Sequence, residues 1–147
     1  MNPPWREEPM FKRLFGELGQ SIGLLVLRLA SGGLMLTHGW SKMSMLFSGN
    51  FKFADPLGIG EAASLVLAAL AEFVASLFVM AGLGTRIAVI PLWVTMAVAA
   101  FIVHGDDPLI RKELALMYLT VYTVLFLTGG GRFSLDALLT ARRAAKK

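Results

Sequence analysis

Long apolar stretches alternate with short polar ones along this chain. Residues 87–104 contain no acidic residue, lysine or arginine, and the stretches 20–40, 62–83 and 113–128 contain one each. A helix rises about 1.5 Å per residue and a hydrocarbon core is roughly 30 Å thick, so each stretch comes close to the length of a membrane crossing. A water-soluble bundle would show a polar face on every turn, whereas these stretches are apolar all round. The pattern therefore predicts four membrane-spanning helices.

Turn signals separate the predicted helices. Gly129-Gly130-Gly131 ends the fourth, and Ser134 is a suitable N-cap for a short basic helix over about 134–145. On the opposite side, Asp107-Pro108 disfavours helix between the third and fourth stretches. We therefore expect an all-α fold, an integral membrane four-helix bundle in which residues 1–147 form a single membrane domain.

The basic residues are unevenly distributed around the predicted spans. Of the fourteen lysines and arginines, nine lie in the N-terminal segment, the connection at Arg86 and the C-terminal tail, and four lie on the other side. The positive-inside rule then places both termini in the cytoplasm of a multi-pass membrane protein. The same distribution accounts for the basic isoelectric point without nucleic acid, so the lipid bilayer is the expected partner. The low charged fraction, 16% against about 25% in soluble domains, agrees with this.

Two charges fall inside predicted spans. Arg28 and Glu72 each lie near the middle third of a stretch, where an isolated charge costs at least about 2.5–3.5 kcal/mol. Their predicted depths are about 10 Å and about 18 Å from the cytoplasmic end, within the joint reach of the two side chains. An Arg28–Glu72 ion pair is the simplest way to keep both charges. Such a pair would either fix helix register or form part of a ligand site, and the sequence leaves both interpretations open.

A second polar group is predicted near the outer face. His38 and His104 come out at nearly the same depth, Glu113 begins the fourth stretch at that level, and Tyr118 lies below it. These side chains would form a polar pocket, or the histidines would simply meet headgroups and water. No metal site is predicted, because no motif with metal-ligand spacing is present. The catalytic residues are not identified, and no cofactor-binding motif is evident.

Several short motifs carry a family resemblance. They are Arg28, His38-Gly39-Trp40-Ser41-Lys42, Ala71-Glu72, Gly82-Leu83-Gly84-Thr85-Arg86, His104, Glu113 and Gly129-Gly130-Gly131-Arg132-Phe133-Ser134-Leu135-Asp136-Ala137-Leu138-Leu139. In order and spacing they resemble the DoxX family, small four-helix inner-membrane proteins of bacteria and archaea. One departure is Gly130, where the family often has proline. The family takes its name from a subunit of a thiosulfate:quinone oxidoreductase, so the resemblance implies a membrane subunit or anchor of a redox complex.

Two functional hypotheses follow. In the first, the chain is a quinone-interacting subunit of a membrane oxidoreductase, not a stand-alone enzyme. Arg28, His38 and His104 would donate hydrogen bonds to the quinone, and Glu72 or Glu113 would relay protons. Electrons would come from a protein partner or from a cofactor for which the sequence shows no motif. In the second, the chain is a non-catalytic assembly or anchoring protein, alone or as a homo-oligomer, without ligand chemistry. A proton or solute conduit is disfavoured by the apolar cytoplasmic halves of the later spans.

Overall fold

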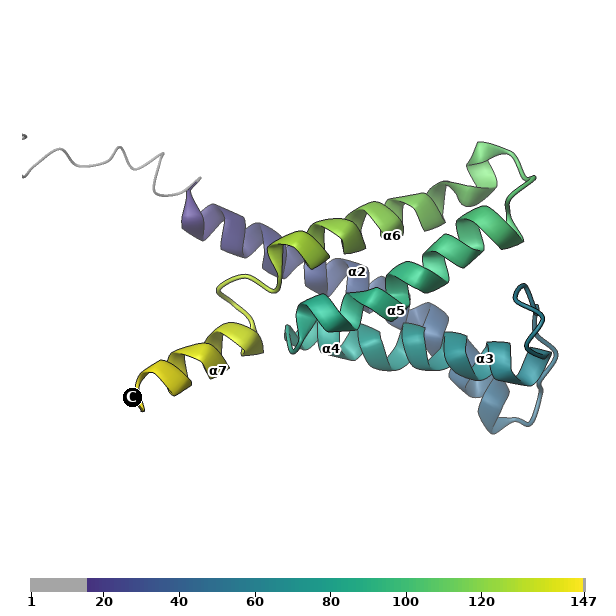
Figure 1. Cartoon of the computed structure of the whole chain (residues 1–147), viewed down its shortest axis with the longest axis horizontal. Helices are drawn as coiled ribbons and strands as arrows, with labels where there is room; N and C mark the ends of the chain where they lie inside the picture. The colour runs from purple at the N-terminus through teal and green to yellow at the C-terminus, as the bar shows by residue number, and fades with distance from the viewer. Residues whose placement is uncertain (1–15, 147) are drawn as a thin grey trace, which may run out of the picture.

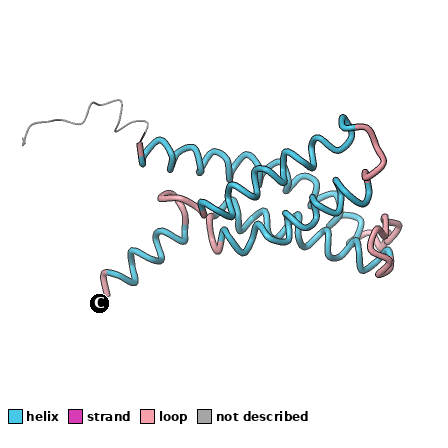
Figure 2. Tube along the Cα trace, turned by 45° about the horizontal axis from the view of Figure 1, so that its top comes forward, coloured by secondary structure: helices cyan, strands magenta, loops and turns pink. Residues whose placement is uncertain are grey.

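The computed structural model describes residues 16–146, and in this part every regular element is helical (Figures 1 and 2). The elements are α2 (Glu17–Phe47), α3 (Glu61–Ala69), η1 (Leu70–Ala75), α4 (Ser76–Ala81), α5 (Thr85–Val98), η2 (Ala99–Val103), α6 (Leu109–Thr128) and α7 (Leu135–Ala144). The segments α3, η1 and α4 form one continuous helix, as do α5 and η2. The all-helical prediction is confirmed for these residues. The basic residues expected near the N-terminus, Arg6, Lys12 and Arg13, lie outside them.

The helices pack as two pairs, and the two pairs meet where α5 contacts α4 and η1. α2 lies along α3, η1 and α4, while α5 lies along α6, and α5 also contacts α4 and η1 (Figure 1). The buried side chains between them are mostly apolar, including Met35, Val79, Leu92, Leu119 and Leu125. Gly39 lets the backbones of α2 and η1 approach closely, because a Cβ there would lie 2.5 Å from the backbone nitrogen of Phe73. Gly32 faces Met80 in the same interface, whereas Gly23 and Gly33 face open space.

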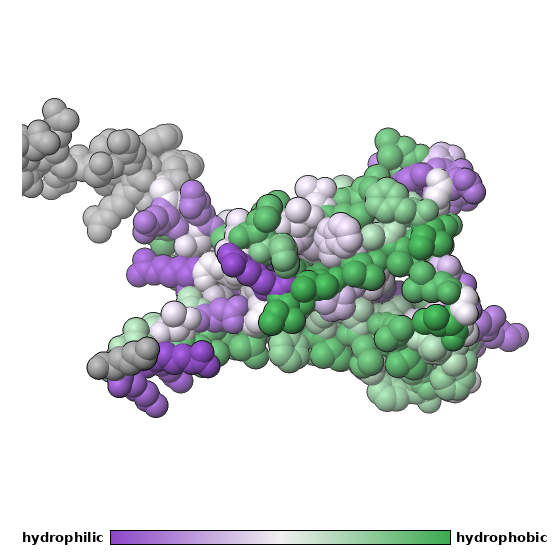
Figure 3. All heavy atoms as spheres, in the orientation of Figure 1, coloured by the Kyte–Doolittle hydropathy of each residue, from purple (hydrophilic) through white to green (hydrophobic). Residues whose placement is uncertain are grey.

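The distribution of polarity is inverted relative to a water-soluble bundle. Arg28 is fully buried and Glu72 is 3% exposed, while Leu34, Ile87 and Leu127 are 62–75% exposed. Apolar side chains cover the flanks of the bundle, and polar ones gather at its ends (Figure 3). Within residues 16–146, three helices are long and apolar enough to cross a membrane, Glu17–Phe47, Glu61–Ala81 and Thr85–Val103. The chain is therefore built to expose its helices to lipid.

The helix boundaries differ from the predicted ones mainly at the end of the bundle that contains Phe47 and Leu109. α2 continues to Phe47, beyond the predicted limit at 40, because no helix-breaking residue occurs before the turn that contains Gly49, whose φ is 70°. α6 begins at Leu109 instead of 113, directly after Pro108, so its first turns include Arg111, Lys112 and Glu113. Because it contains these three charges, α6 is not among the helices that are apolar enough to cross a membrane. The predicted stop at Gly129 and the Ser134 cap of α7 are confirmed, since Ser134 Oγ accepts the Ala137 N–H.

Two π-helical turns interrupt the ladder of α-helical hydrogen bonds. η1 contains Glu72, and η2 ends directly before His104, whose backbone N–H bonds the carbonyl of Ala99 five residues earlier. A π turn inserts one extra residue and so redirects the side chains around it, and such turns are frequent at functional sites. Neither was predicted, because no simple residue pattern marks them.

Candidate functional site

An ion pair inside the bundle joins α2 to η1. Lys42 Nζ lies 2.5 Å from Glu72 Oε2, with the Glu72 side chain 4% exposed and the Lys42 side chain 18% exposed. The ammonium group also lies 5.9 Å from the centre of the Phe53 ring, which comes from the loop after α2. A charge-assisted hydrogen bond and a cation–π contact together compensate two charges that lipid would otherwise expel.

The predicted Arg28–Glu72 pair is wrong. Among the described residues Glu72 pairs with Lys42, while the Arg28 guanidinium donates from Nη2 to the backbone carbonyl of Phe133 at 2.5 Å. The physical reason is the length of α2. Because the helix continues to Phe47, Lys42 lies within it, next to the close approach at Gly39, and it faces Glu72 directly. The predicted span covers residues 20–40, so Lys42 lies two residues beyond its end.

A pocket of about 580 Å³ lies beside this ion pair. Its walls come from α2, α3, η1, α5, η2 and the loop 53–59. The lining residues are Lys42, Phe53, Ala54, Pro56, Leu57, Ile59, Ser64, Leu67, Ala68, Ala71, Glu72, Ile90, Pro91, Val94, Thr95, Met96, Val98, Ala99 and Val103. Several of the apolar lining residues, including Leu67 and Val94, are also exposed on the flank of the bundle. The pocket therefore opens sideways, towards lipid, and Lys42 and Glu72 are its charged groups.

Two buried tyrosines lie on the other side of Glu72. Tyr118 and Tyr122 on α6 stack with their ring centres 5.7 Å apart, and both are within electrostatic reach of the Glu72 carboxylate. The hydroxyl groups of Tyr122 and Ser76 are fully buried and have no hydrogen-bond partner in the described part of the chain. Of the predicted outer group, Tyr118 thus belongs to the interior beside Glu72.

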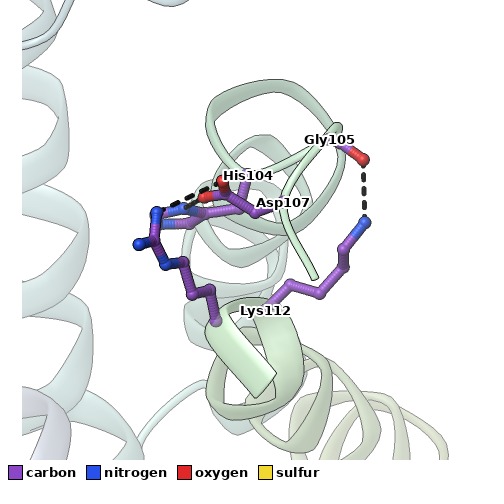
Figure 4. Close-up of polar contacts among 5 residues, drawn as sticks. His104, Gly105, Asp107 and Lys112 are labelled. Atoms are coloured by element: carbon purple, nitrogen blue, oxygen red, sulfur yellow. Dashed lines mark hydrogen bonds and ion pairs between the residues drawn. The ribbon is translucent and has the colours of Figure 1, made fainter. Parts of the chain in front are cut away.

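The other members of that predicted group do not gather around one pocket. His38 and Glu113 are exposed, and no hydrogen bond links either side chain to another described residue. His104 Nδ1 instead lies 2.8 Å from Asp107 Oδ2 in the turn after η2, where Arg111 also approaches Asp107 at 3.4 Å and Lys112 donates to the Gly105 carbonyl (Figure 4). The hydrogen bond from His104 and the charge of Arg111 hold the pKa of Asp107 below its usual value. This cluster organises a turn.

The loop that covers the pocket has its own anchor. Asp55 accepts hydrogen bonds from the backbone N–H groups of Ile59 and Gly60 and from Ser64 Oγ at 2.8–3.0 Å. These bonds favour the charged form, so the pKa of Asp55 lies below its ordinary value, with the Gly60 bond the largest contribution. The anchor fixes the loop residues Pro56 to Ile59 against the start of α3.

At the end of the bundle away from Lys42, residues Gly82, Gly84, Thr85 and Asp136 form a separate cluster, called here the end cluster. Gly82 and Gly84 adopt left-handed conformations, with φ of 68° and 57°, and make the tight turn between α4 and α5. The Asp136 carboxylate accepts the N–H groups of Gly84 at 2.7 Å and Thr85 at 3.0 Å, while the Asp136 N–H bonds the Gly82 carbonyl. A side chain from α7 therefore caps the start of α5.

Arg28 belongs to this same end cluster. Its guanidinium packs against the backbone of Gly82 as well as bonding Phe133, so a side chain at Gly82 would overlap it. Nε and Nη1 of Arg28 have no hydrogen-bond partner among residues 16–146, and the charge of Asp136 acts on the guanidinium. Arg28 thus ties α2 to the turn before α7, far along the helix from Lys42.

Comparison with known proteins identifies the family. No curated protein and no solved structure matches the chain. The model of the DoxX family matches residues 23–105, which cover most of α2, the Lys42–Glu72 pair, the side pocket and the turn at Gly82 and Gly84. Since this match extends over more than half of the 147 residues, the chain belongs to the DoxX family.

Proposed function

We propose that the chain is the membrane subunit of a quinone-linked redox complex, with the side pocket as its quinone-binding site. In this proposal α6 is a fourth membrane crossing, and residues 1–147 form one membrane domain in the inner membrane of a bacterial or archaeal cell. The start of α2 and the end of α7 lie at the same end of the bundle, and the positive-inside rule assigns that end to the cytoplasm (Figure 1). A protein partner supplies the electrons.

The observation that carries the proposal is a buried ion pair on the wall of a lipid-facing pocket. An isoprenoid quinone has an apolar chain and a ring with two carbonyl acceptors, and it reaches its sites from within the bilayer. The pocket provides apolar walls open to the side, with Lys42 and Glu72 as polar groups. Lys42 would donate a hydrogen bond to a ring carbonyl, and Glu72 would hold or release the proton that accompanies reduction.

The other predicted ligand-binding residues take different roles in this proposal. Tyr118 lies beside Glu72 and modulates its environment, whereas Arg28 supports the fold at the opposite end. His38 and Glu113 are exposed, and His104 bonds Asp107. Glu72 is therefore the residue retained from the sequence-based set, and Lys42 is added to it.

Quinone content tests the proposal. The chain purified in mild detergent is extracted with solvent and its quinone measured by mass spectrometry, beside Glu72→Gln and a matched control, Glu113→Gln, which makes the same chemical change at an exposed position. Near-stoichiometric quinone in the parent and in the control, with a large loss in Glu72→Gln, is expected. Quinone at background in all three proteins, or equal retention in all three, would exclude the pocket as a quinone site.

The alternative function is a non-catalytic assembly protein, and the end cluster favours it. Four residues of the motifs that resemble the DoxX family hold α2, α5 and α7 together. They are Arg28, Gly82, Gly84 and Asp136. This function predicts that Arg28→Met lowers the amount of folded protein and that the activity of the complex falls only in proportion. An activity loss that exceeds the loss of protein would contradict it.

A further inference from the structure

An open hollow lies at the end of the bundle that carries α7. It has a volume of about 650 Å³ and is lined by Gly84, Arg86, Ile87, Gly129, Gly130, Gly131, Ser134, Asp136, Ala137, Thr140 and Ala141. The only carboxylate in this lining, that of Asp136, is occupied by the backbone N–H groups of Gly84 and Thr85. Arg86 is exposed and uses Nη2 for the Leu127 carbonyl. The hollow is therefore lined by a cation, the hydroxyl groups of Ser134 and Thr140, and a glycine backbone.

α7 borders this hollow and is amphipathic. Leu135, Leu138 and Leu139 share one face at helical spacing and are 41–46% exposed, and no residue of α7 is buried. Arg142 and Arg143 lie in the last turn of the helix, Lys146 follows two residues after its end, and Asp136 is its only acidic residue. The bundle thus leaves the apolar face of α7 uncovered beside a group of exposed cations.

We infer that the hollow and α7 together bind the headgroups of acidic phospholipids in the surrounding bilayer. The position is continuous with the lipid-facing flank, because Ile87 lines the hollow and is 75% exposed. A lipid phosphate is attracted by Arg86, Arg142 and Arg143, while the leucines of α7 enter the boundary between headgroups and acyl chains. Charge complementarity selects acidic over zwitterionic lipid. This inference is independent of quinone binding.

A fluorescent label on α7 tests the inference. The chain contains no cysteine, so Leu138→Cys provides a unique site for an environment-sensitive fluorophore. The full chain is placed in bilayer discs of phosphatidylcholine alone or of phosphatidylcholine and phosphatidylglycerol in equal parts. A blue-shifted, quencher-protected label is expected in the acidic discs. The shift should be lost in 1 M salt, where the Debye length falls to about 3 Å.

Charge variants make the test specific. Each basic residue near an acidic surface contributes about 1 kcal/mol, which is about a fivefold change in binding, so Arg142→Gln with Arg143→Gln should lower the docked-to-free ratio by about 25-fold. The pair Arg111→Gln with Lys112→Gln makes the same change at the other end and should leave the label shift unaltered. Arg86→Gln, which keeps a donor for Leu127, should reduce the phosphatidylglycerol that co-purifies in native mass spectrometry by about fivefold.

Three outcomes would overturn the inference. The first is a label that is equally exposed in acidic and neutral discs, which would favour an acidic protein as the partner of the cationic face. The second is an equal response of the two double variants. The third is a blue shift in neutral discs on addition of inorganic phosphate, which would identify free phosphate as the ligand.

Discussion

Glu72 of η1 and Lys42 of α2 form an ion pair, 2.5 Å between Oε2 and Nζ, beside the close approach of the two helices at Gly39. The π turn directs Glu72 towards α2, and Gly39 allows the two backbones to meet beside it. The pair therefore connects the packing of the bundle to the wall of the side pocket. A change to either residue should affect both stability and ligand binding.

Removal of Lys42 tests the structural part of this connection. Lys42→Met leaves the Glu72 carboxylate buried without its partner, and breaking a buried pair in this way costs about 3–5 kcal/mol. We expect a clear fall in the thermal unfolding temperature in detergent. The double variant Lys42→Met with Glu72→Gln should recover part of the loss, because it removes the uncompensated charge. Lys52→Met, at an exposed loop position, is the control, and an equal effect of Lys42→Met and Lys52→Met would contradict the pairing.

The close approach at Gly39 predicts opposite effects at two glycines of the same helix. Gly39→Ala places a methyl group against the backbone of Glu72 and Phe73, and overpacking of this kind costs about 1–3 kcal/mol. Gly33→Ala meets open space and should stabilise the helix by about 0.5–1 kcal/mol, because alanine loses less backbone entropy on folding. Unfolding curves of both variants measure the difference. Destabilisation of similar size by both would show that the helices do not meet at Gly39.

The Asp136 cap predicts a local effect at two distant segments. Asp136→Asn loses the charge that accepts the Gly84 and Thr85 N–H groups, and hydrogen bonds to charged groups are worth about 1.5–3 kcal/mol each. Hydrogen exchange should accelerate both at the start of α5 and throughout α7, while the part of α2 that follows Lys42 stays protected. Asp106→Asn, an exposed aspartate at the other end, is the control. Faster exchange confined to α7 would mean that Asp136 does not cap α5.

The loop over the pocket should respond to acid through Asp55. Its folded-state pKa lies below the ordinary value of about 3.9, so the bonds that it accepts stabilise the loop above that pH. That stability is lost as the pH falls through the lowered pKa. Amide exchange at Ile59 and Gly60, measured between pH 5 and pH 2, should rise beyond the intrinsic pH trend in the parent. Asp55→Asn should show fast exchange at every pH, and a variant with the same profile as the parent would refute the anchor.

The fold was largely predictable from the sequence because lipid imposes simple requirements. A helix exposed to lipid needs an uninterrupted apolar length and must end at a turn, so the stop at Gly129 and the cap at Ser134 were predictable from single residues. The end of α2 at Phe47 and the start of α6 at Leu109 were less predictable, since helices can continue past the hydrocarbon core. The candidate site was predictable only in part. Glu72 is conspicuous as a charge in an apolar stretch, but Lys42 lies beyond the predicted end of its span.

The local order of residues determined that this chain forms apolar helices of membrane length. It also determined where these helices stop and which charges need compensation, because these properties depend on each segment alone. Tertiary packing decided the partners. Lys42 instead of Arg28 pairs with Glu72 because the extension of α2 and the approach at Gly39 set which residues face each other. Asp136 caps α5 from more than fifty residues away because the start of α7 lies against the turn at Gly84. Such contacts depend on the relative depth and rotation of separate helices, and hydrophobic pattern specifies neither quantity to within the length of a side chain.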